Sequence, residues 1–328
     1  MTDRSRDLAV AVGAVRAAAR ACRTVQQRLV DAETLEKKDK SPVTVADFAS
    51  QAIVCALLER ELPGDAVVGE EDAATLRQAT QASLVQAIVE RVSRELDATL
   101  DAERVLGWID RGNADARSER YWTLDPIDGT KGFLRGEQYA VALALLERGE
   151  VVLGVLGCPN LPFNGGVGAL FTAVRGAATS VRSLWDADAP GAKVRVGAID
   201  IAADARLCES VESAHSDQSE SARIAESLGI RHEPFRIDSQ CKYAAVARND
   251  ASIYLRLPTR EDYQEKIWDH AAGSIVVESA GGRVTDASGA PLDFTHGPTL
   301  AANRGVVATC GTIHDEVIAA VRAGRDAA

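Results

Sequence analysis

Two aspartates lie three positions apart in the segment YWTLDPIDGTKGFLRG, residues 121–136. On a continuous strand, residues i and i+3 point to opposite faces, so Asp125 and Asp128 can share one site only if the chain bends between them. Pro126 supplies that bend, because it fixes φ and cannot continue the hydrogen bonding of a strand. We therefore expect the two carboxylates to converge at the end of a buried strand.

Converging carboxylates in a buried setting indicate a bound cation. Like charges raise each other's pKa, and a hard divalent ion removes that cost. Carboxylates without a neighbouring histidine or cysteine suit Mg²⁺ or Mn²⁺ and not zinc. Gly129 and Gly132 let the backbone approach a ligand closely, and a helix that begins at Thr130 would point its first N–H groups at a phosphate. The segment predicts phosphoryl transfer assisted by metal ions.

Other acids stand where elements begin or end, and each has an ordinary explanation when taken alone. Asp47 follows Thr44 by three residues, as in a capping box that would start a helix at Thr44. Asp269 can occupy a helix N-terminus favourably. The run GEED, residues 69–72, follows a short apolar strand and could be solvated. These acids become candidate ligands only together with the pair in DPIDGT.

The same motif has a competing interpretation. Phosphatases of the haloacid dehalogenase class carry D-x-D-G-T and use the first aspartate as a covalent nucleophile. This chain has D-P-I-D-G-T, with one additional residue, and the segment lies far from the N-terminus with other acids upstream. The additional residue changes the geometry and disfavours that class.

Helices and strands must bring these acids together, and the hydrophobic pattern predicts both in each half of the chain. The predicted helices cover residues 7–31, 44–62, 83–111, 219–229, 239–250, 269–279 and 312–324. The predicted strands lie in segments 65–72, 120–125, 139–158 (a hairpin turning at Arg148-Gly149), 168–181, 193–197, 252–258 and 305–310. This mixture predicts an α/β (α+β) layered fold, with a linker in DADAPGAK dividing residues 1–187 from 188–328.

Composition limits the function classes. The chain has 328 residues, 46% of them hydrophobic, and a formal net charge of −11, which argues against a nucleic-acid polymer as partner. No apolar run approaches the roughly 18 residues of a membrane span, so we expect no membrane partner. The six cysteines form no C-x-x-C pair, which favours a reduced, cytoplasmic setting.

Several segments together resemble a known family. GEED, DPIDGT and WDHAAGSIVVESAGG, in that order, are similar to the signatures of the inositol monophosphatase superfamily of Mg²⁺-dependent, lithium-sensitive phosphatases. SPVTVADFASQAIV, DPIDGTKGFLRGEQYAVALALL, GCPNLP, IDSQCKYAAVARNDASIYLRLP and YQEKIWDHAAG resemble its 3'(2'),5'-bisphosphate nucleotidase branch. The resemblance implies a layered α-β-α-β-α sandwich with two sheets. It also implies removal of the 3'-phosphate of 3'-phosphoadenosine 5'-phosphate, and of its 5'-phosphosulfate and 2'-phosphate analogues, by direct attack of a metal-activated water.

The resemblance also implies roles for individual residues. Two or three Mg²⁺ ions, or Mn²⁺ as a substitute, would be held by Glu70, Asp125, the Ile127 carbonyl, Asp128 and Asp269. Thr130, paired with Asp47, would orient and deprotonate the attacking water. The substrate would contact Gly129, Thr130, His215, Ser239, Lys242 and Arg256. The chain departs from the family at Gln218, where members usually have a second histidine, and this departure leaves the base preference open. The charged loop with Lys37 and Lys40 would form a flap near the site.

Alternatives remain at the level of the sequence. The same chemistry could act on inositol phosphates or another sugar phosphate. A non-catalytic nucleotide-binding protein is a third interpretation, which the retained acids and Thr130 disfavour because a binder needs no water-activating pair. We expect a monomer whose partner is a small nucleotide bisphosphate.

Overall fold

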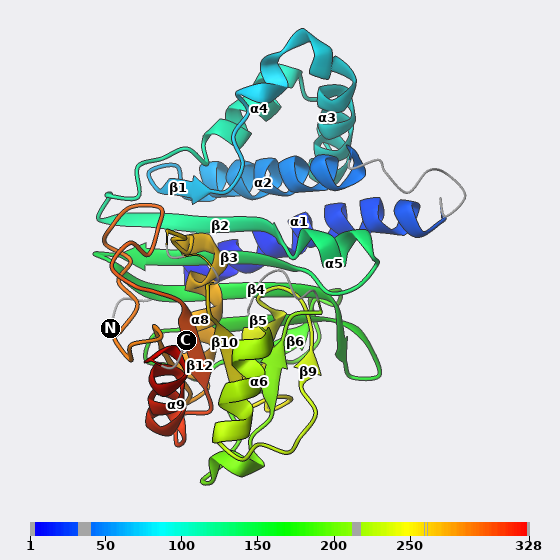
Figure 1. Ribbon diagram of the computed structural model, residues 1–328. Helices are drawn as coiled ribbons and strands as arrows, with labels where there is room; N and C mark the ends of the chain where they lie inside the picture. Colours follow the sequence, from blue (N-terminus) through cyan, green and yellow to red (C-terminus); the bar gives the residue numbers. More distant parts are fainter. Residues whose placement is uncertain (1–3, 32–40, 212–217, 259, 261, 327–328) are drawn as a thin grey trace.

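The computed structural model describes residues 4–31, 41–211, 218–258, 260 and 262–326 (Figure 1). Its strands form a seven-stranded sheet, in the order β1-β2-β3-β4-β5-β6-β7, and a five-stranded sheet, in the order β11-β12-β10-β8-β9. In the described part of the chain, no helix is long and apolar enough to cross a bilayer.

The first sheet is mostly antiparallel, and only β1 and β2 run parallel among its neighbouring pairs. Its strands are β1 (Ala66–Gly69), β2 (Arg120–Asp128), β3 (Ala140–Glu147), β4 (Glu150–Phe163), β5 (Gly166–Val174), β6 (Ser180–Ser183) and β7 (Ala192–Lys193). The hairpin between β3 and β4 turns at Arg148-Gly149, as predicted, with both residues at positive φ.

Helices cover both faces of this sheet, as Figure 1 shows. Helices α1 (Ser5–Asp31) and α2 (Ser41–Glu61) pack on one face, with α3 (Ala82–Leu96) and α4 (Ala102–Asp110) outside them. Helices α7 (Cys241–Ala247) and α8 (Ala271–Ser279) lie on the other face, between the two sheets.

Strand β3 explains how the sheet accommodates helices on both faces. Its sequence AVALALLE alternates, so that Val141, Leu143 and Leu145 enter the core under α1 and α2. Ala140, Ala142 and Ala144 face α7 and α8. The small side chains of this second face let α8 approach closely. At Gly154 of β4, a Cβ atom would come within 2.5 Å of Ile275 Cγ2 in α8.

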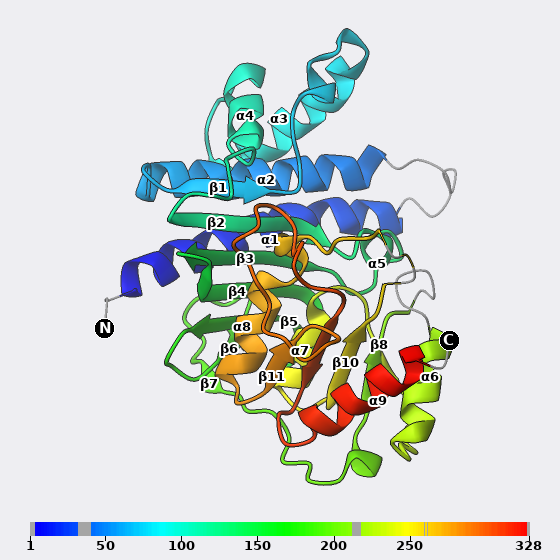
Figure 2. The ribbon, with the colours of Figure 1, turned by 60° about the vertical axis from the view of Figure 1, so that its left-hand side comes forward.

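The second sheet completes the sandwich. Its strands are β8 (Leu207–Glu209), β9 (Phe235–Arg236), β10 (Ile253–Arg256), β11 (Arg283–Thr285) and β12 (Val306–Thr309). Helices α6 (Gln218–Ser227) and α9 (His314–Asp326) lie side by side against a third core cluster on its outer face (Figure 2). The layers are therefore α-β-α-β-α, which confirms the predicted fold class.

The structure corrects several predicted elements. Helix α2 begins at Ser41, so Thr44 lies inside the helix and is not its N-cap. The predicted helix over 83–111 is two helices, because Asp97 adopts the left-handed conformation and Asp101 caps α4 by accepting from Arg104 N. Of the strand predicted at 193–197, only Lys193 is in a strand, β7. The short strands β8, β9 and β11 had not been predicted.

The predicted division at residue 187 falls near the change of sheet. The first sheet ends at Lys193 and the second begins at Leu207. One core cluster joins residues of both halves, including Leu156 of β4 and Val276 of α8. Two domains therefore stay a proposal.

Candidate active site

A cavity of about 310 Å³ lies where the end of β2 meets the start of α7 and the end of β10. Ten of the twelve predicted site residues line it: Glu70, Asp125, Ile127, Asp128, Gly129, Thr130, Ser239, Lys242, Arg256 and Asp269. Asp47 is not among the lining residues, and His215 lies outside the described residues. The acids Glu70, Asp125, Asp128 and Asp269 are called the acidic wall below. Lys242 and Arg256 are called the cationic wall.

The end of β2 bends in the way that Pro126 predicts. Asp125 pairs with Ala142 of β3, but Asp128 pairs with Ala140, so three steps on β2 match two on β3. This extra residue is a bulge, and it brings both aspartates to the cavity. Ser50 of α2 donates a hydrogen bond from its Oγ to the Pro126 carbonyl (2.9 Å), and this bond stabilises the bend.

The chain turns sharply after the bulge. Gly129 has φ of 92° and precedes the five-residue helix α5 (Thr130–Leu134), so the predicted helix start is confirmed. A Cβ at Gly129 would lie 2.9 Å from the Cβ of Ser239, itself a non-glycine residue at φ of 67°. Glycine at this position therefore allows the turn and lets the second half of the chain approach the first.

The acidic wall is electrostatically unfavourable without a cation. Asp125 is 2% exposed, and burial raises the pKa of its carboxyl well above the usual range. The neighbouring charges of Glu70, Asp128 and Asp269 raise that pKa further. Its Oδ1 atom is buried and has no hydrogen-bond partner in the described part of the chain.

Glu70 and Asp269 show the same effect at the open side of the wall. Removal from bulk water raises the pKa of Glu70 to about 8, and the charges of Asp269, Glu71 and Asp128 contribute. Glu70 still has exposed surface, so solvent screens part of this repulsion. Burial also raises the pKa of Asp269 to about 6, although His270 and Arg256 oppose the increase.

These residues fit a hard divalent cation. The wall offers several carboxylate oxygens, among them the unpartnered Asp125 Oδ1. Burial raises the pKa of Glu70, Asp125 and Asp128, and neighbouring carboxylates raise the pKa of Glu70 and Asp125 further. Oxygen ligands of this kind are those that Mg²⁺ prefers. The acidic wall could therefore hold such an ion.

Asp128 accepts a hydrogen bond from Gln240, a contact that the sequence does not predict. The backbone N–H of Gln240 donates to Asp128 Oδ2. The side chain of Gln240 is 2% exposed; its Nε2 donates to the Trp268 carbonyl (2.9 Å) and its Oε1 accepts from Gly273 N (3.0 Å). Gln240 thus ties Asp128 to the turn η5 (Ile267–Asp269), which carries Asp269.

The two residues of the proposed water-activating pair differ in their exposure to solvent. Thr130 is exposed at the start of α5, whereas Asp47 is buried in α2. Burial raises the pKa of Asp47 well above its usual value, and Glu71 and Glu70 add to this effect. No hydrogen bond joins Asp47 to Thr130 among the hydrogen bonds of the described residues, so their pairing stays a prediction.

In the cationic wall, Lys242 is buried and Arg256 is partly buried. Lys242 is 5% exposed at the start of α7, and its Nζ lies 5.3 Å from the centroid of the Tyr254 ring. Burial lowers the pKa of Lys242, although Asp128 opposes the decrease. Arg256 ends β10 and hydrogen-bonds through Nε to Glu265 and through Nη2 to the Tyr263 hydroxyl, both at 3.3 Å. Lys242 and Arg256 thus both contact other side chains of the protein, unlike a fully solvated lysine or arginine on the surface.

Sequence reasoning did not select Glu265, Tyr263 and Gln240, which complete the site. Glu265 and Gln240 are buried and Tyr263 is exposed, but polar side chains of these types have no distinctive spacing, and only their partners reveal them. The predicted flap with Lys37 and Lys40 also lies outside the described residues.

Known proteins resemble the chain over almost its whole length. The model of the Inositol monophosphatase family matches residues 3–325. A 3'(2'),5'-bisphosphate nucleotidase of Oryza sativa is 47% identical, covering 96% of this chain and 93% of the relative. A 3'(2'),5'-bisphosphate nucleotidase of Schizosaccharomyces pombe is 44% identical, covering 96% of this chain and 94% of the relative.

Solved structures share the fold. An inositol monophosphatase from Anabaena superposes with a TM-score of 0.64 at 22% identity, covering 98% of this chain and 97% of the other. SuhB of Mycobacterium tuberculosis gives a TM-score of 0.64 at 20% identity, covering 99% and 98%. At this identity the likeness concerns the fold alone.

Proposed function

We propose that this chain, which belongs to the inositol monophosphatase family, is a 3'(2'),5'-bisphosphate nucleotidase. Its substrate would be 3'-phosphoadenosine 5'-phosphate, with the 5'-phosphosulfate and 2'-phosphate analogues also accepted. The observation that carries this proposal is the cavity itself, whose lining combines the acidic wall with the buried Lys242 and the partly buried Arg256. Such a cavity suits a molecule with two separate anionic groups, one at the reacting ester and one remote from it.

The acidic wall would bind Mg²⁺ through Glu70, Asp125, the Ile127 carbonyl, Asp128 and Asp269. Bound divalent cations supply charge neutralisation at the phosphoryl group and make water more acidic. We propose two or three ions, with Mn²⁺ as a substitute. The chain belongs to the inositol monophosphatase family, so the haloacid dehalogenase interpretation is wrong. We therefore propose Asp125 as a metal ligand and not as a nucleophile.

The water that attacks phosphorus would be oriented and deprotonated by Thr130 together with Asp47. The raised pKa of Asp47 supports this role, because a more basic carboxylate accepts a proton more readily. The N–H groups of Gly129 and Thr130 at the start of α5 would hold the oxygens of the reacting phosphate. Direct transfer to water leaves no phosphoenzyme.

The remote part of the substrate would be held by the second half of the chain. Lys242 is a buried point charge and Arg256 presents a planar fork, and both suit a phosphate. Ser239 lies beside Gly129 and would contact the nucleotide between the two phosphates. His215 would contribute as well. Binding energy from the remote phosphate would be used to orient the ester at the acidic wall.

We also propose that the protein acts as a cytoplasmic monomer on this small molecule. The six cysteines are free and buried, which is compatible with a reducing compartment.

Phosphate release from a panel of adenosine bisphosphates and inositol phosphates, with Mg²⁺, tests the proposed function. We expect adenosine 3',5'-bisphosphate to give the highest kcat/KM. Preference for an inositol phosphate would replace the nucleotide with a sugar phosphate as substrate. Tight nucleotide binding with no release of phosphate would identify a non-catalytic binder.

A further inference from the structure

Glu265 is a buried acid for which the proposed mechanism has no use. Its side chain is 2% exposed, in the segment between β10 and η5. Carboxylates at this depth are stable only when they are paired and hydrogen-bonded. Both oxygens of Glu265 are paired: Oε1 accepts from Arg256 Nε (3.3 Å) and Oε2 accepts from His270 Nε2 (3.1 Å). Glu265 therefore touches the cationic wall directly.

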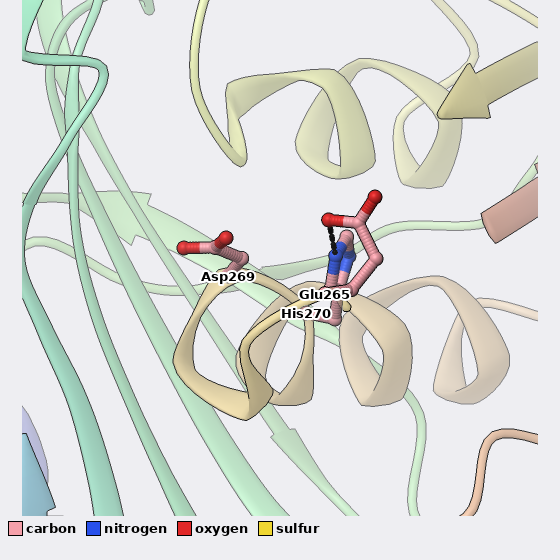
Figure 3. Close-up of side chains that lie close together, drawn as sticks. All are labelled: Glu265, Asp269 and His270. Atoms are coloured by element: carbon pink, nitrogen blue, oxygen red, sulfur yellow. Dashed lines mark hydrogen bonds and ion pairs between the residues drawn. The ribbon is translucent and has the colours of Figure 1, made fainter. Parts of the chain in front are cut away.

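His270 secures Glu265 from the other side. His270 is 1% exposed, and its Nδ1 accepts a hydrogen bond from the Tyr243 hydroxyl (2.7 Å). Its Nε2 donates to Glu265, as Figure 3 shows. Burial raises the pKa of Tyr243 well above its usual value, so the phenol keeps the proton that it donates. The Glu265 carboxylate is thus held in one orientation by a buried chain of hydrogen bonds.

The same geometry argues against a separate metal site here. Ligand atoms of Glu265, Asp269 and His270 lie within 4.8 Å of one another. However, both nitrogens of His270 are occupied by hydrogen bonds, and Figure 3 shows Asp269 pointing away from the Glu265–His270 pair. Glu265 serves Arg256 and His270, and Asp269 belongs to the acidic wall.

Arg256 is held along one edge and open along another. Its Nε donates to Glu265, and its Nη2 donates to the hydroxyl of Tyr263, whose ring centroid lies 5.9 Å from Arg256 Cζ. Nη1 has no hydrogen-bond partner within the described part of the chain, and Arg256 lines the cavity. The guanidinium is therefore oriented by protein acceptors while donors stay available to a ligand.

We infer that Glu265 is a positioning residue that fixes the Arg256 guanidinium so that its free edge receives the remote phosphate of the substrate. This inference rests on the proposed function, because only a bisphosphate has that second group. A flexible arginine would have to lose side-chain freedom on binding, whereas an arginine held by Glu265 has lost it already. The negative charge of Glu265 opposes phosphate binding, so its benefit must come from orientation.

A double-mutant cycle tests the inference. Wild type, Glu265→Ala, Arg256→Ala and the double variant are compared by kcat/KM for adenosine 3',5'-bisphosphate and for 3'-AMP, which lacks the 5'-phosphate. Glu265→Ala should lose about 10-fold on the bisphosphate, mainly through KM, and less than about 3-fold on 3'-AMP. The double variant should be no worse than Arg256→Ala within about 2-fold, because Glu265 acts through Arg256.

Conservative variants separate orientation from charge. Glu265→Gln keeps an acceptor for Arg256 Nε and should restore most of the activity on the bisphosphate. Glu265→Asp keeps the charge but withdraws the carboxylate by one methylene, so it should show a bisphosphate-selective loss even if the alanine variant does not fold. Asp262→Ala is the matched control, since this exposed acid pairs with Arg260 (2.7 Å). This variant should leave kcat/KM for both substrates unchanged.

Two results would overturn the inference while leaving the proposed function intact. One is an equal loss on both substrates in Glu265→Ala and Glu265→Asp, which would mean that Glu265 supports the acidic wall through His270. The other is losses that add in the double variant. A wild type that does not hydrolyse the bisphosphate would instead contradict the proposed function, and this inference with it.

Discussion

The two walls of the cavity are built from different parts of the fold. The acidic wall comes mainly from the ends of the neighbouring parallel strands β1 and β2, completed by Asp269 from η5. The cationic wall comes from a short helix and a strand of the second sheet, α7 and β10. In the acidic wall, the buried Asp125 lies among other carboxylates and has an unpartnered oxygen that suits a cation, whereas in the cationic wall Arg256 is already paired with Glu265. If the proposed function is right, this difference predicts that mutations can alter the chemical step and the choice of substrate separately.

The largest expected effect is on the acidic wall. Asp125→Asn should lower kcat by about 10³-fold or more on every phosphate ester, because it removes charge where the cations bind. Steady-state phosphate release with saturating Mg²⁺ measures this loss. Asp72→Asn is the control, because Asp72 is exposed and, within the described part of the chain, its carboxylate accepts a hydrogen bond only from Ala74 N (2.8 Å). Full turnover of wild type in excess EDTA would refute the metal role of this wall.

The next effect is on the cationic wall. Arg256→Ala should lower kcat/KM for adenosine 3',5'-bisphosphate by about 10- to 100-fold, since a charge-assisted contact contributes roughly 1.5–3 kcal/mol. The loss on 3'-AMP should be slight. Arg260→Ala provides the comparison, because Arg260 is an exposed arginine paired with Asp262. An equal loss on both substrates would show that Arg256 supports the fold or the acidic wall.

A smaller effect should come from Gln240, which ties Asp128 to the turn that carries Asp269. Gln240→Met keeps the side-chain volume but removes the bonds to the Trp268 carbonyl and Gly273 N. We expect about a 10-fold loss of kcat on both substrates, and destabilisation of roughly 1–3 kcal/mol from the unpaired buried groups. Kinetics and denaturant unfolding measure these changes. The exposed Gln264→Met is the control, and an effect confined to the bisphosphate would place Gln240 with substrate choice instead.

The smallest expected effect is the pH dependence of stability without metal. The raised pKa values of Glu70 (about 8) and Asp269 (about 6) mean that the folded state binds more protons than the unfolded state between about pH 4 and 8. The stability of the metal-free protein should therefore fall as pH rises through this window. Mg²⁺ should raise Tm by a few degrees, and by more at pH 8.5 than at pH 5.5. Thermal melts in EDTA and in Mg²⁺ measure this difference, and a Tm increase independent of pH would contradict it.

Local sequence rules predicted the backbone around Asp125 and Asp128 well. Pro126 between two aspartates required a bend, which is present, and the helix considered at Thr130 is present as α5. The predicted start of α2 at Thr44 is wrong, since the helix begins at Ser41. The sequence does contain a signal for the earlier start, because Pro42 favours the first turn of a helix. The break at Asp97 was hidden because the flanking segments share a helical pattern.

The other half of the site depends on contacts between distant segments. Periodicity does not reveal that Lys242 is buried beside Tyr254, or that Glu265 reaches Arg256. A buried glutamate and an exposed glutamate have the same letter in the sequence, and only packing distinguishes them. The resemblance to a family supplied Lys242 and Arg256, but it did not supply the residues that hold them.

The most direct test of the account is the substrate ratio, kcat/KM for adenosine 3',5'-bisphosphate divided by that for 3'-AMP, measured in wild type, Asp125→Asn and Arg256→Ala. Separate walls predict that Asp125→Asn leaves this ratio within about 3-fold of wild type although its rates collapse. They also predict that Arg256→Ala lowers the ratio by about 10- to 100-fold with little change on 3'-AMP. A ratio that changes equally in both variants, or in neither, would contradict the account.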